Sequence, residues 1–243
     1  MEKRKRIPEE NFGEIHIAVA ARPLDTCSAR NSTLYTMHST LYTGLICPNP
    51  AYVHTPLIEI QSVQDDSPLK QAAARIEHFD YLLFTSRFAV KYFLPYLTTE
   101  LKLIKQLKVV SIGSTTTAAL KEAGIEDIQQ VEQDNSYGVV DWFDKQQRGK
   151  VLIPRSNLAL GIIPEGLQKS GFEVTAVTAY ENRMPEHPKR INLDEIDEII
   201  FTSPSTIDNF ILLYGAMPTD KKLTTRGPIT ENHLKTIIKE QSL

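Results

Sequence analysis

Two short stretches of this sequence resemble each other, LLFTSRFAV at Leu82–Val90 and IIFTSPSTI at Ile199–Ile207. Each begins with an apolar run typical of a buried strand and continues through Phe-Thr-Ser into residues that favour a helix. The second stretch begins roughly 117 residues after the first, an interval that indicates a repeated domain and not a short solenoid repeat. The sequence therefore predicts the same strand-to-helix turn twice.

A second pair of segments extends this repeat. IGSTTTAAL follows the first turn and RGPITENHL follows the second, and both fit the pattern G-x-x-T-x-x-x-L. Gly113 with Thr116 and Gly227 with Thr230 therefore hold equivalent places, each where a strand passes into a helix. The repeat predicts two similar α/β units.

Composition limits the classes of function. The chain has 243 residues, of which 41% are hydrophobic, so it can bury a sizeable core. Its formal net charge of -3 gives little support for non-specific nucleic-acid binding, and an anionic ligand must be held by local groups. Cys27 and Cys47 form neither a disulfide framework nor a metal-type cluster.

The chain also lacks the signals of a secreted or membrane protein. The opening MEKRKRIPEE is basic, but charged residues follow it where a secretory signal has an apolar core. The longest uncharged segment, Asn31–Ile58, contains three prolines and many hydroxyl residues, which excludes a convincing membrane span. We therefore expect a cytoplasmic protein with no membrane partner.

Short apolar runs alternate with longer helical patterns along the chain, which indicates an α/β architecture with mainly parallel sheets. The predicted strands are IHIAVAA, LIEI, YLLFT, KVVSI, KVLIP, FEVTAV and DEIIFT. Helices are predicted over SRFAVKYFLPYL, STTTAALKEAG and NLALGIIPEGLQKSG, and Gly124 and Gly171 suit the ends of the last two. The segment STLYT occurs at Ser32 and again at Ser39, and this seven-residue spacing predicts one helical face.

Hydroxyl side chains gather at the predicted strand-to-helix turns, where open α/β sheets bind ligands. They are Ser86, Thr116, Ser203, Ser205 and Thr230. Unpaired backbone N–H groups of the first helical turn lie at the same edge, so these turns can bind an anionic substrate. Helix capping alone would also explain each hydroxyl taken singly, and both interpretations stay open.

Taken in order, seven motifs resemble the uroporphyrinogen-III synthase family: AARP, PLIEI, FTSRFAV, IGSTTTAAL, TAYENR, FTSPS and GPIT. They extend from Ile15 to Leu234. The resemblance implies an enzyme without a cofactor that closes linear hydroxymethylbilane into the asymmetric tetrapyrrole, a cyclising hydro-lyase of haem biosynthesis. It also implies a monomer with a small-molecule substrate and no nucleic-acid partner.

The resemblance further implies two α/β domains joined by two connecting strands. One domain would comprise residues 1–55 and 181–243, and the inserted domain residues 56–180. PLIEI and TAVTAY would be the connecting strands, paired as a ladder, and the cleft between the domains would hold the substrate. Thr206 stands where the family has glycine or alanine, a residue large enough to narrow that half of the cleft.

Arginines that follow predicted strands are candidates for binding the eight carboxylates of this substrate: Arg22 in AARP, Arg87 in FTSRFAV and Arg155 in IPRS. A surface ion pair is the ordinary alternative for Arg22 and Arg155. Arg87 stands at a predicted helix start, where a cation opposes the helix dipole, so an anion-binding role is favoured there.

Tyr180 matches the tyrosine that the family places at the cleft, and the resemblance makes it the catalytic candidate. A phenol is uncharged at neutral pH and can donate a hydrogen bond to a departing hydroxyl. The harder task is selectivity, because ring closure must proceed through the substituted carbon of ring D and a spiro intermediate. Binding that orients several rings can impose this, so we expect mild effects from single mutations.

Four alternatives compete with this interpretation. A nucleotide-binding enzyme lacks support because neither G-x-G-x-x-G nor a Walker-type lysine motif is present. The six histidines are too scattered for a metal site, and no G-x-S-x-G elbow supports a serine hydrolase. The remaining alternative is a non-catalytic, two-lobed α/β protein that binds a small anion.

Overall fold

The computed structural model describes residues 39–97, 104 and 106–241, and contacts between residues divide it into two compact units. Unit 1 consists of Met1–Ile58 with Met184–Leu243, and unit 2 is the inserted segment Glu59–Arg183. The crossings between the units lie three residues later than the predicted ones at 55/56 and 180/181. Whether the two units are independent domains stays a prediction.

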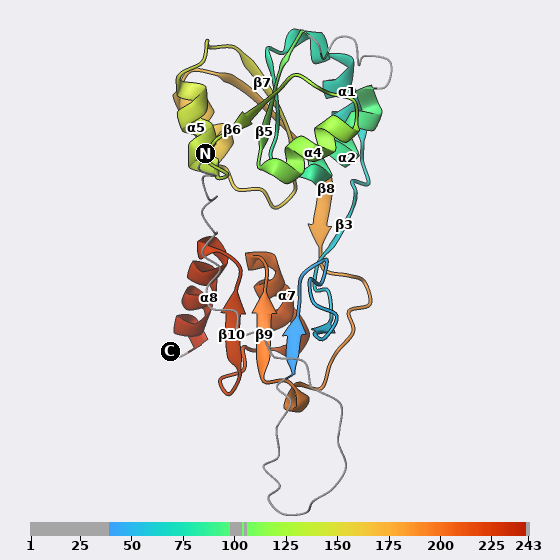
Figure 1. Cartoon of the computed structure of the whole chain (residues 1–243), viewed down its shortest axis with the longest axis vertical. Coiled ribbons are helices and arrows are strands. Elements are labelled where there is room, and N and C mark those ends of the chain that lie inside the picture. The colour runs from blue at the N-terminus through green and yellow to red at the C-terminus, as the bar shows by residue number, and fades with distance from the viewer. Residues whose placement is uncertain (1–38, 98–103, 105, 242–243) are drawn as a thin grey trace, which may run out of the picture. The chain divides into compact units, whose positions relative to one another are not determined.

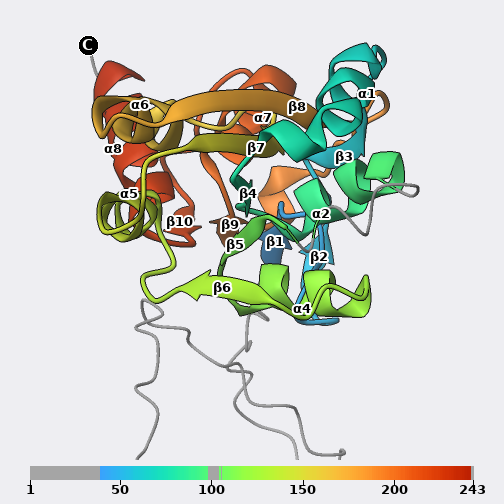
Figure 2. The same ribbon diagram turned by 90° about the horizontal axis from the view of Figure 1, so that it is seen from above.

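Unit 2 is a six-stranded sheet with helices on both faces (Figures 1 and 2). Its strands are β3 (Glu59–Ser62), β4 (Tyr81–Phe84), β5 (Lys108–Ile112), β6 (Ile128–Val131), β7 (Lys150–Ser156) and β8 (Glu173–Arg183). The spatial order is β3-β8-β7-β4-β5-β6, and every pair is parallel except β3 with β8. The helices are α1 (Ser67–Ala74), α2 (Arg87–Phe93), α4 (Ser114–Glu122), α5 (Ser136–Asp144) and α6 (Ile162–Lys169), with 3-10 turns at Ile76–His78 and Leu94–Leu97.

Two apolar cores cover the two faces of this sheet. Alternate side chains of β4 point to opposite faces, so Leu82 and Phe84 pack with α1, α2 and α4, whereas Tyr81 and Leu83 pack with α5 and α6. Figure 2 shows α5 and α6 on one side of the strands and α1 and α2 on the other. Every residue of β4 is buried, as expected of a central parallel strand.

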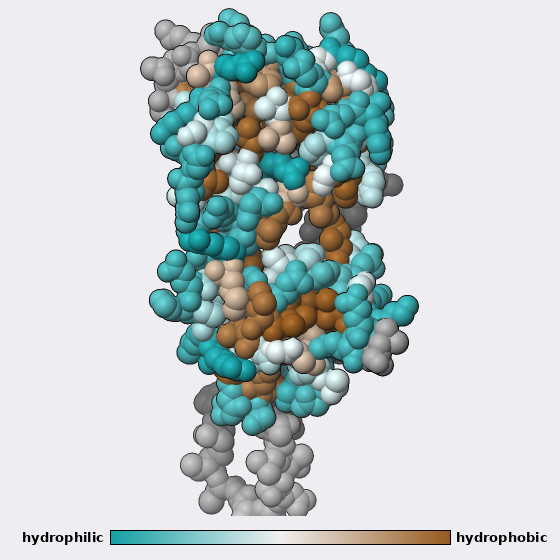
Figure 3. Space-filling view, turned by 180° about the vertical axis from the view of Figure 1, so that it is seen from behind, coloured by the Kyte–Doolittle hydropathy of each residue, from teal (hydrophilic) through white to brown (hydrophobic). Residues whose placement is uncertain are grey.

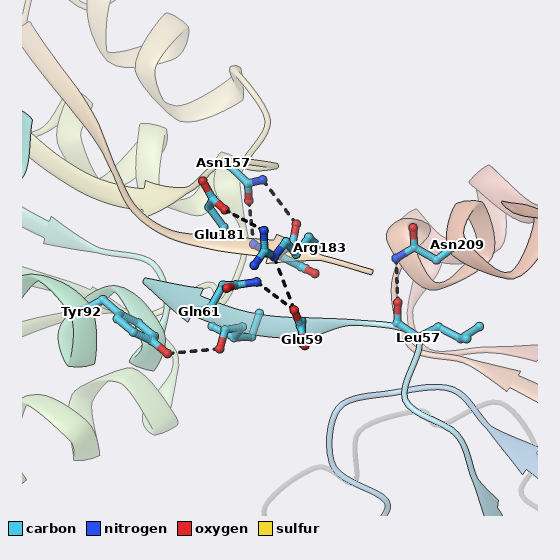
Figure 4. A network of polar contacts seen from close by, with 10 residues as sticks. Leu57, Glu59, Gln61, Tyr92, Asn157, Glu181, Arg183 and Asn209 are labelled. Atoms are coloured by element: carbon cyan, nitrogen blue, oxygen red, sulfur yellow. Dashed lines mark hydrogen bonds and ion pairs between the residues drawn. The ribbon is translucent and has the colours of Figure 1, made fainter. Parts of the chain in front are cut away.

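Unit 1 contains a smaller parallel sheet with the order β10-β9-β1-β2 (Figure 1). Its elements are β1 (Thr40–Tyr42), β2 (Val53–His54), β9 (Glu198–Phe201), α7 (Pro204–Tyr214), β10 (Lys222–Thr225) and α8 (Pro228–Gln241), with a 3-10 turn at Leu193–Glu195. One core cluster joins β1 and β9 to both helices, and Phe210 packs between the rings of Phe201 and Tyr214. Asn209 Nδ2 donates to the Leu57 carbonyl at 2.7 Å, which attaches Leu57 to α7 (Figure 4).

The predicted α/β class with mainly parallel sheets is confirmed. The strand predicted at IHIAVAA lies outside the described residues, whereas the other six predicted strands all form. Strands β2, β6 and β10 were not predicted, because each is short, lies at a described sheet edge and carries polar residues in place of an apolar run.

Three details of the sequence prediction are wrong. The second STLYT is the strand β1 and not a helix, because Leu41 and Tyr42 pair with both β9 and β2. Helix α6 begins at Ile162 and not near Asn157, since the residues between them form a loop after β7. The two predicted connecting strands do pair as an antiparallel ladder, but it joins Glu59–Ser62 to Tyr180–Arg183, and the segment TAVTAY pairs with β7 in the sheet.

The surface carries apolar side chains on both units, and on the unit that contains α7 they gather on the face seen from behind (Figure 3). Leu212 on α7 is 76% exposed, and Ile229 and Ile238 on α8 are exposed as well. The outer side of α7 is therefore not a purely polar face. Within the described part of the chain, no helix is both long and apolar enough to cross a membrane.

Candidate functional site

The turn after β4 is organised by Ser86, which caps α2. Its backbone is extended, and its Oγ accepts a hydrogen bond from the Phe88 N–H at 3.1 Å. This is the geometry expected of a serine N-cap, in which the side chain satisfies an amide of the first helical turn. Because β4 ends at Phe84, the cap fixes the Ser86 hydroxyl at the carboxyl edge of the sheet.

Tyr180 comes to the same hydroxyl from β8. Its Oη donates to Ser86 Oγ at 3.2 Å, although the two residues are 94 positions apart. The ring lies against Phe88 and stacks on Tyr92 of α2, with centroid distances of 5.8 and 6.1 Å, and the residue is only 7% exposed. Ser86 Oγ thus accepts from the Phe88 amide and from the phenol, which leaves its own O–H to donate.

The polypeptide around Tyr180 is held by a polar network, of which Glu59, Tyr92, Asn157 and Arg183 are labelled in Figure 4. The carbonyl of Tyr180 accepts from the Asn157 N–H at 3.2 Å, and Asn157 Oδ1 accepts from the Asn182 N–H at 2.8 Å. Arg183 Nε lies 3.4 Å from Glu59 Oε1 across the β3–β8 ladder, and Tyr92 Oη donates to the Ile60 carbonyl at 3.2 Å. These bonds fix the strand from which the phenol extends.

Arg87 and Arg155 differ in what their guanidinium groups contact. Arg87 is exposed at the start of α2, 5.0 Å from the centre of the Phe88 ring, and no described acidic group pairs with it. Arg155 at the end of β7 donates to the carbonyls of Ala159 and Leu160, and so holds the loop that precedes α6. Arg22 lies outside the described residues.

Thr116 and Thr230 occupy matching positions in the two copies of G-x-x-T. Each is the third residue of its helix, and each helix follows a glycine with positive φ, 75° at Gly113 and 83° at Gly227. The two threonines are 2% and 3% exposed, so both side chains face the interior. The structure thus shows that the two turns have the same backbone arrangement. Contact between the two threonine side chains and a ligand stays a prediction.

The turn after β9 has the same Phe-Thr-Ser sequence as the turn after β4, but its serine makes different hydrogen bonds. Ser203 precedes α7, and its Oγ lies 2.9 Å from Ser205 Oγ. Thr206 is buried; its Oγ1 donates to the Ser203 carbonyl at 2.7 Å and accepts from the Thr202 and Ser203 amides. The expectation that Thr206 narrows this part of the site is therefore wrong, because its side chain faces its own turn.

Two residues at the carboxyl edge of the unit 1 sheet were not singled out from the sequence. Tyr42 ends β1, and its hydroxyl accepts a hydrogen bond from Arg226 Nη1 at 3.2 Å. Arg226 directly precedes Gly227 of the repeated motif, so its place was visible in the sequence. Tyr42 gave no such signal, since the predicted helix concealed the strand that carries it.

The described residues at the carboxyl edges of the two sheets include no metal-binding cluster and no group with a shifted pKa. No group of three or more His, Cys, Asp or Glu that could hold a metal ion occurs in the described ranges. Burial raises the pKa of the Tyr81 phenol, which lies at the opposite, amino end of β4. A hydrogen bond from Lys70 lowers the pKa of Asp66, just before α1. The described site is therefore built from hydroxyl, amide and guanidinium donors.

Comparison with known proteins identifies the family. The family model for uroporphyrinogen-III synthase HemD matches residues 51–237. A putative uroporphyrinogen-III synthase of Methanothermobacter thermautotrophicus is 28% identical over 198 residues, which cover 74% of this chain and 78% of that protein. A uroporphyrinogen-III synthase of Chlorobaculum parvum is 32% identical over 151 residues, 57% of this chain and 61% of that protein.

Solved structures support the same fold. A mutant uroporphyrinogen III synthase of Thermus thermophilus matches with a TM-score of 0.60 at 17% identity, covering 82% of this chain and 88% of that one. The uroporphyrinogen-III synthetase of Helicobacter pylori gives 0.57 at 19% identity, covering 85% and 90%. Because the family model covers most of the sequence, the chain belongs to the uroporphyrinogen-III synthase family, enzymes of porphyrin biosynthesis.

Proposed function

We propose that this chain closes hydroxymethylbilane to uroporphyrinogen III, with loss of water and inversion of ring D, and that residues of both units bind the substrate. Family membership supports the reaction. The hydrogen bond from Tyr180 Oη to Ser86 Oγ supports the roles of these two residues, because it joins two predicted site residues at one sheet edge. A non-catalytic binding protein is not favoured, since the matched family and relatives are named for the synthase.

Departure of the hydroxymethyl oxygen is assigned to the Tyr180–Ser86 pair. The pyrrole nitrogens push this group out and leave an azafulvene cation, so the enzyme needs only to stabilise the leaving oxygen. Ser86 Oγ accepts two hydrogen bonds, which polarise its own O–H and make it a stronger donor. We propose that Ser86 donates to the leaving oxygen and that Tyr180, nearly buried, positions and polarises Ser86.

The substrate carboxylates are assigned to donors at the helix starts. The first N–H groups of α2 and α4 are unpaired within their helices and carry partial positive charge. Helices α7 and α8 begin with proline, which has no N–H, so their first donors are the amides of Ser205 and Ile229. Arg87 adds an exposed cation at α2, and Ser203 with Ser205 adds hydroxyls at α7. Arg22, Arg155, Thr116 and Thr230 stay in the proposed set; the two buried threonines would act through their backbone amides.

These fixed donors would select the isomer by orientation. Held in one geometry, the bilane closes through the substituted carbon of ring D; free in solution, it closes directly and gives the symmetric isomer I. Positioning of this kind can supply several kcal/mol, of the order of the roughly 3 kcal/mol that a hundredfold preference requires. We further propose that the protein acts as a cytoplasmic monomer, which light scattering would test against its mass of 27.4 kDa.

The direct test supplies freshly made hydroxymethylbilane and separates the oxidised porphyrin isomers. We expect isomer III to exceed isomer I in proportion to the protein added, because catalysed closure outruns the spontaneous reaction. A heat-denatured sample is the control for the spontaneous background. If the protein yields isomer I alone at the rate of that control, the proposed function is wrong.

A further inference from the structure

The two copies of the repeated motif differ in charge at the residue that precedes the glycine. Ile112 precedes Gly113 in unit 2, whereas Arg226 precedes Gly227 in unit 1. Both glycines have positive φ and both lead into a helix, so the two side chains leave the backbone at equivalent points. In unit 2 the same turn forms with an apolar residue, Ile112, at this position. The turn itself therefore does not require an arginine.

The Arg226 side chain extends across the carboxyl edge of its sheet. Its amide donates to the Phe201 carbonyl at 2.9 Å, which continues the pairing of β10 with β9. Its Nη1 donates to the hydroxyl of Tyr42 on β1. Because β9 lies between β10 and β1, the side chain spans β9 (Figure 1 shows β9 beside β10). The guanidinium thus lies in the row of strand ends that holds Ser203.

Tyr42 is a fixed partner for this guanidinium. It is 2% exposed, its ring stacks on Tyr52 with a centroid distance of 6.3 Å, and His54 lies 6.0 Å away. Gly44 allows this packing, since a Cβ there would come within 2.8 Å of the Tyr42 ring and 2.6 Å of Thr202. A buried phenol in such a setting holds one orientation, and so it orients the arginine.

The positive charge of Arg226 is not neutralised by the described residues. Its side chain donates to an uncharged phenol, the residue is exposed, and no described carboxylate lies within ion-pair distance. Arg183, by contrast, pairs with Glu59. Guanidinium has five N–H donors in a planar fork and binds a carboxylate through two of them. One donor fixed by Tyr42 leaves others to bind an anion.

We propose that Arg226, oriented by the Tyr42 hydroxyl, binds a carboxylate of the linear tetrapyrrole and that Tyr42 is its positioning residue. The inference rests on the proposed function and adds a binding residue that the seven family motifs do not contain. It also gives the two copies of the repeat different roles: the unit 1 copy binds charge through a side chain at the point where the unit 2 copy has an apolar residue.

The test compares Arg226→Ile, which installs the unit 2 residue, with Arg226→Lys and Tyr42→Phe. We expect Arg226→Ile to raise KM for hydroxymethylbilane roughly tenfold, as for the loss of a charge-assisted hydrogen bond, with kcat nearly unchanged. Lysine keeps the positive charge but cannot bind a carboxylate through two parallel N–H groups, and Tyr42→Phe removes the hydrogen bond that orients the guanidinium. Both variants should therefore raise KM less than Arg226→Ile does. Arg75→Ile, which removes an exposed arginine of unit 2, is the control of equal charge and should leave KM unchanged.

A second measurement keeps this inference separate from the reaction. Binding of uroporphyrin, a cyclic octacarboxylate, is measured by calorimetry for the same variants, and Arg226→Ile should weaken it roughly tenfold. If the wild type makes no isomer III, the proposed function fails and calorimetry alone decides about Arg226. If Arg226→Ile and Arg75→Ile give equal KM and equal affinity, or if Arg226→Ile lowers only the melting temperature, Arg226 is a structural tie and the inference is wrong.

Discussion

Phe210→Ala is expected to destabilise unit 1 by about 3–5 kcal/mol while unit 2 remains folded. Phe210 is fully buried on α7, with its ring 5.4 Å from that of Phe201 and 4.4 Å from that of Tyr214. Unit 1 has one described core cluster, and truncation leaves a cavity at its centre. A loss of this size is a large fraction of the stability of a small domain.

The single tryptophan makes this prediction measurable. Trp142 lies on α5 in unit 2, 5.0 Å from Phe143, so its fluorescence reports that unit. In urea, Phe210→Ala should lower the midpoint of part of the circular dichroism signal and leave the fluorescence midpoint unchanged. Phe143→Ala is the matched control, because Phe143 is buried in unit 2, and it should shift the fluorescence instead. Equal shifts of both signals in Phe210→Ala would contradict the prediction of two independent domains.

Tyr180→Phe is expected to lower kcat by roughly tenfold, below the range usual for a full general acid, because the phenol acts through Ser86 and departure of the hydroxyl needs only modest help. Phenylalanine keeps the ring contacts with Phe88 and Tyr92 and removes the hydrogen bond to Ser86. The fold should therefore survive, and KM should change little. Rates measured at saturating hydroxymethylbilane, with melting curves alongside, separate catalysis from stability.

A double-mutant cycle tests whether Tyr180 and Ser86 act as one unit. Ser86→Ala removes the donor to the leaving oxygen together with the cap of α2, so it should lower kcat and cost about 1 kcal/mol of stability. If Tyr180 works through Ser86, the double variant should be no slower than Ser86→Ala alone. Multiplicative losses would show that the phenol acts without Ser86, and a kcat of Tyr180→Phe equal to that of the wild type would remove it from catalysis.

The sequence predicted the fold well where its signal was local. Apolar runs such as Tyr81–Phe84 and Lys108–Ile112 identify strands because both faces of a central parallel strand are buried. Edge strands such as Lys222–Thr225 contain no fully buried residue and no such run. The strand at Leu41 was mistaken for a helix because a seven-residue spacing also fits a helical face, and only pairing with β9 decides between them.

For the candidate site, the sequence located the turns but not the direction of the side chains. The G-x-x-T pattern found Thr116 and Thr230, yet the third residue of each helix faces the core, which a pattern of residue types does not reveal. The contact of Tyr180 with Ser86 depends on how β8 and α2 pack, so spacing in the sequence does not encode it. Arg226 was visible in the repeat, but its partner Tyr42 becomes evident only once β1 is a strand.

Binding of one substrate by both units is the central proposal, and hydrogen exchange measured with and without uroporphyrinogen III tests it most directly. Bound ligand should slow exchange of the amides in the first turn of α2 and α4 in unit 2, and of those that follow the initial proline of α7 and α8 in unit 1, because these donors are proposed to hold the carboxylates. Peptides from α5, whose start is not in the proposed set, serve as the internal control. Slower exchange at the helix starts of one unit only, with the other unit unchanged at saturating ligand, would contradict binding of the substrate by both units.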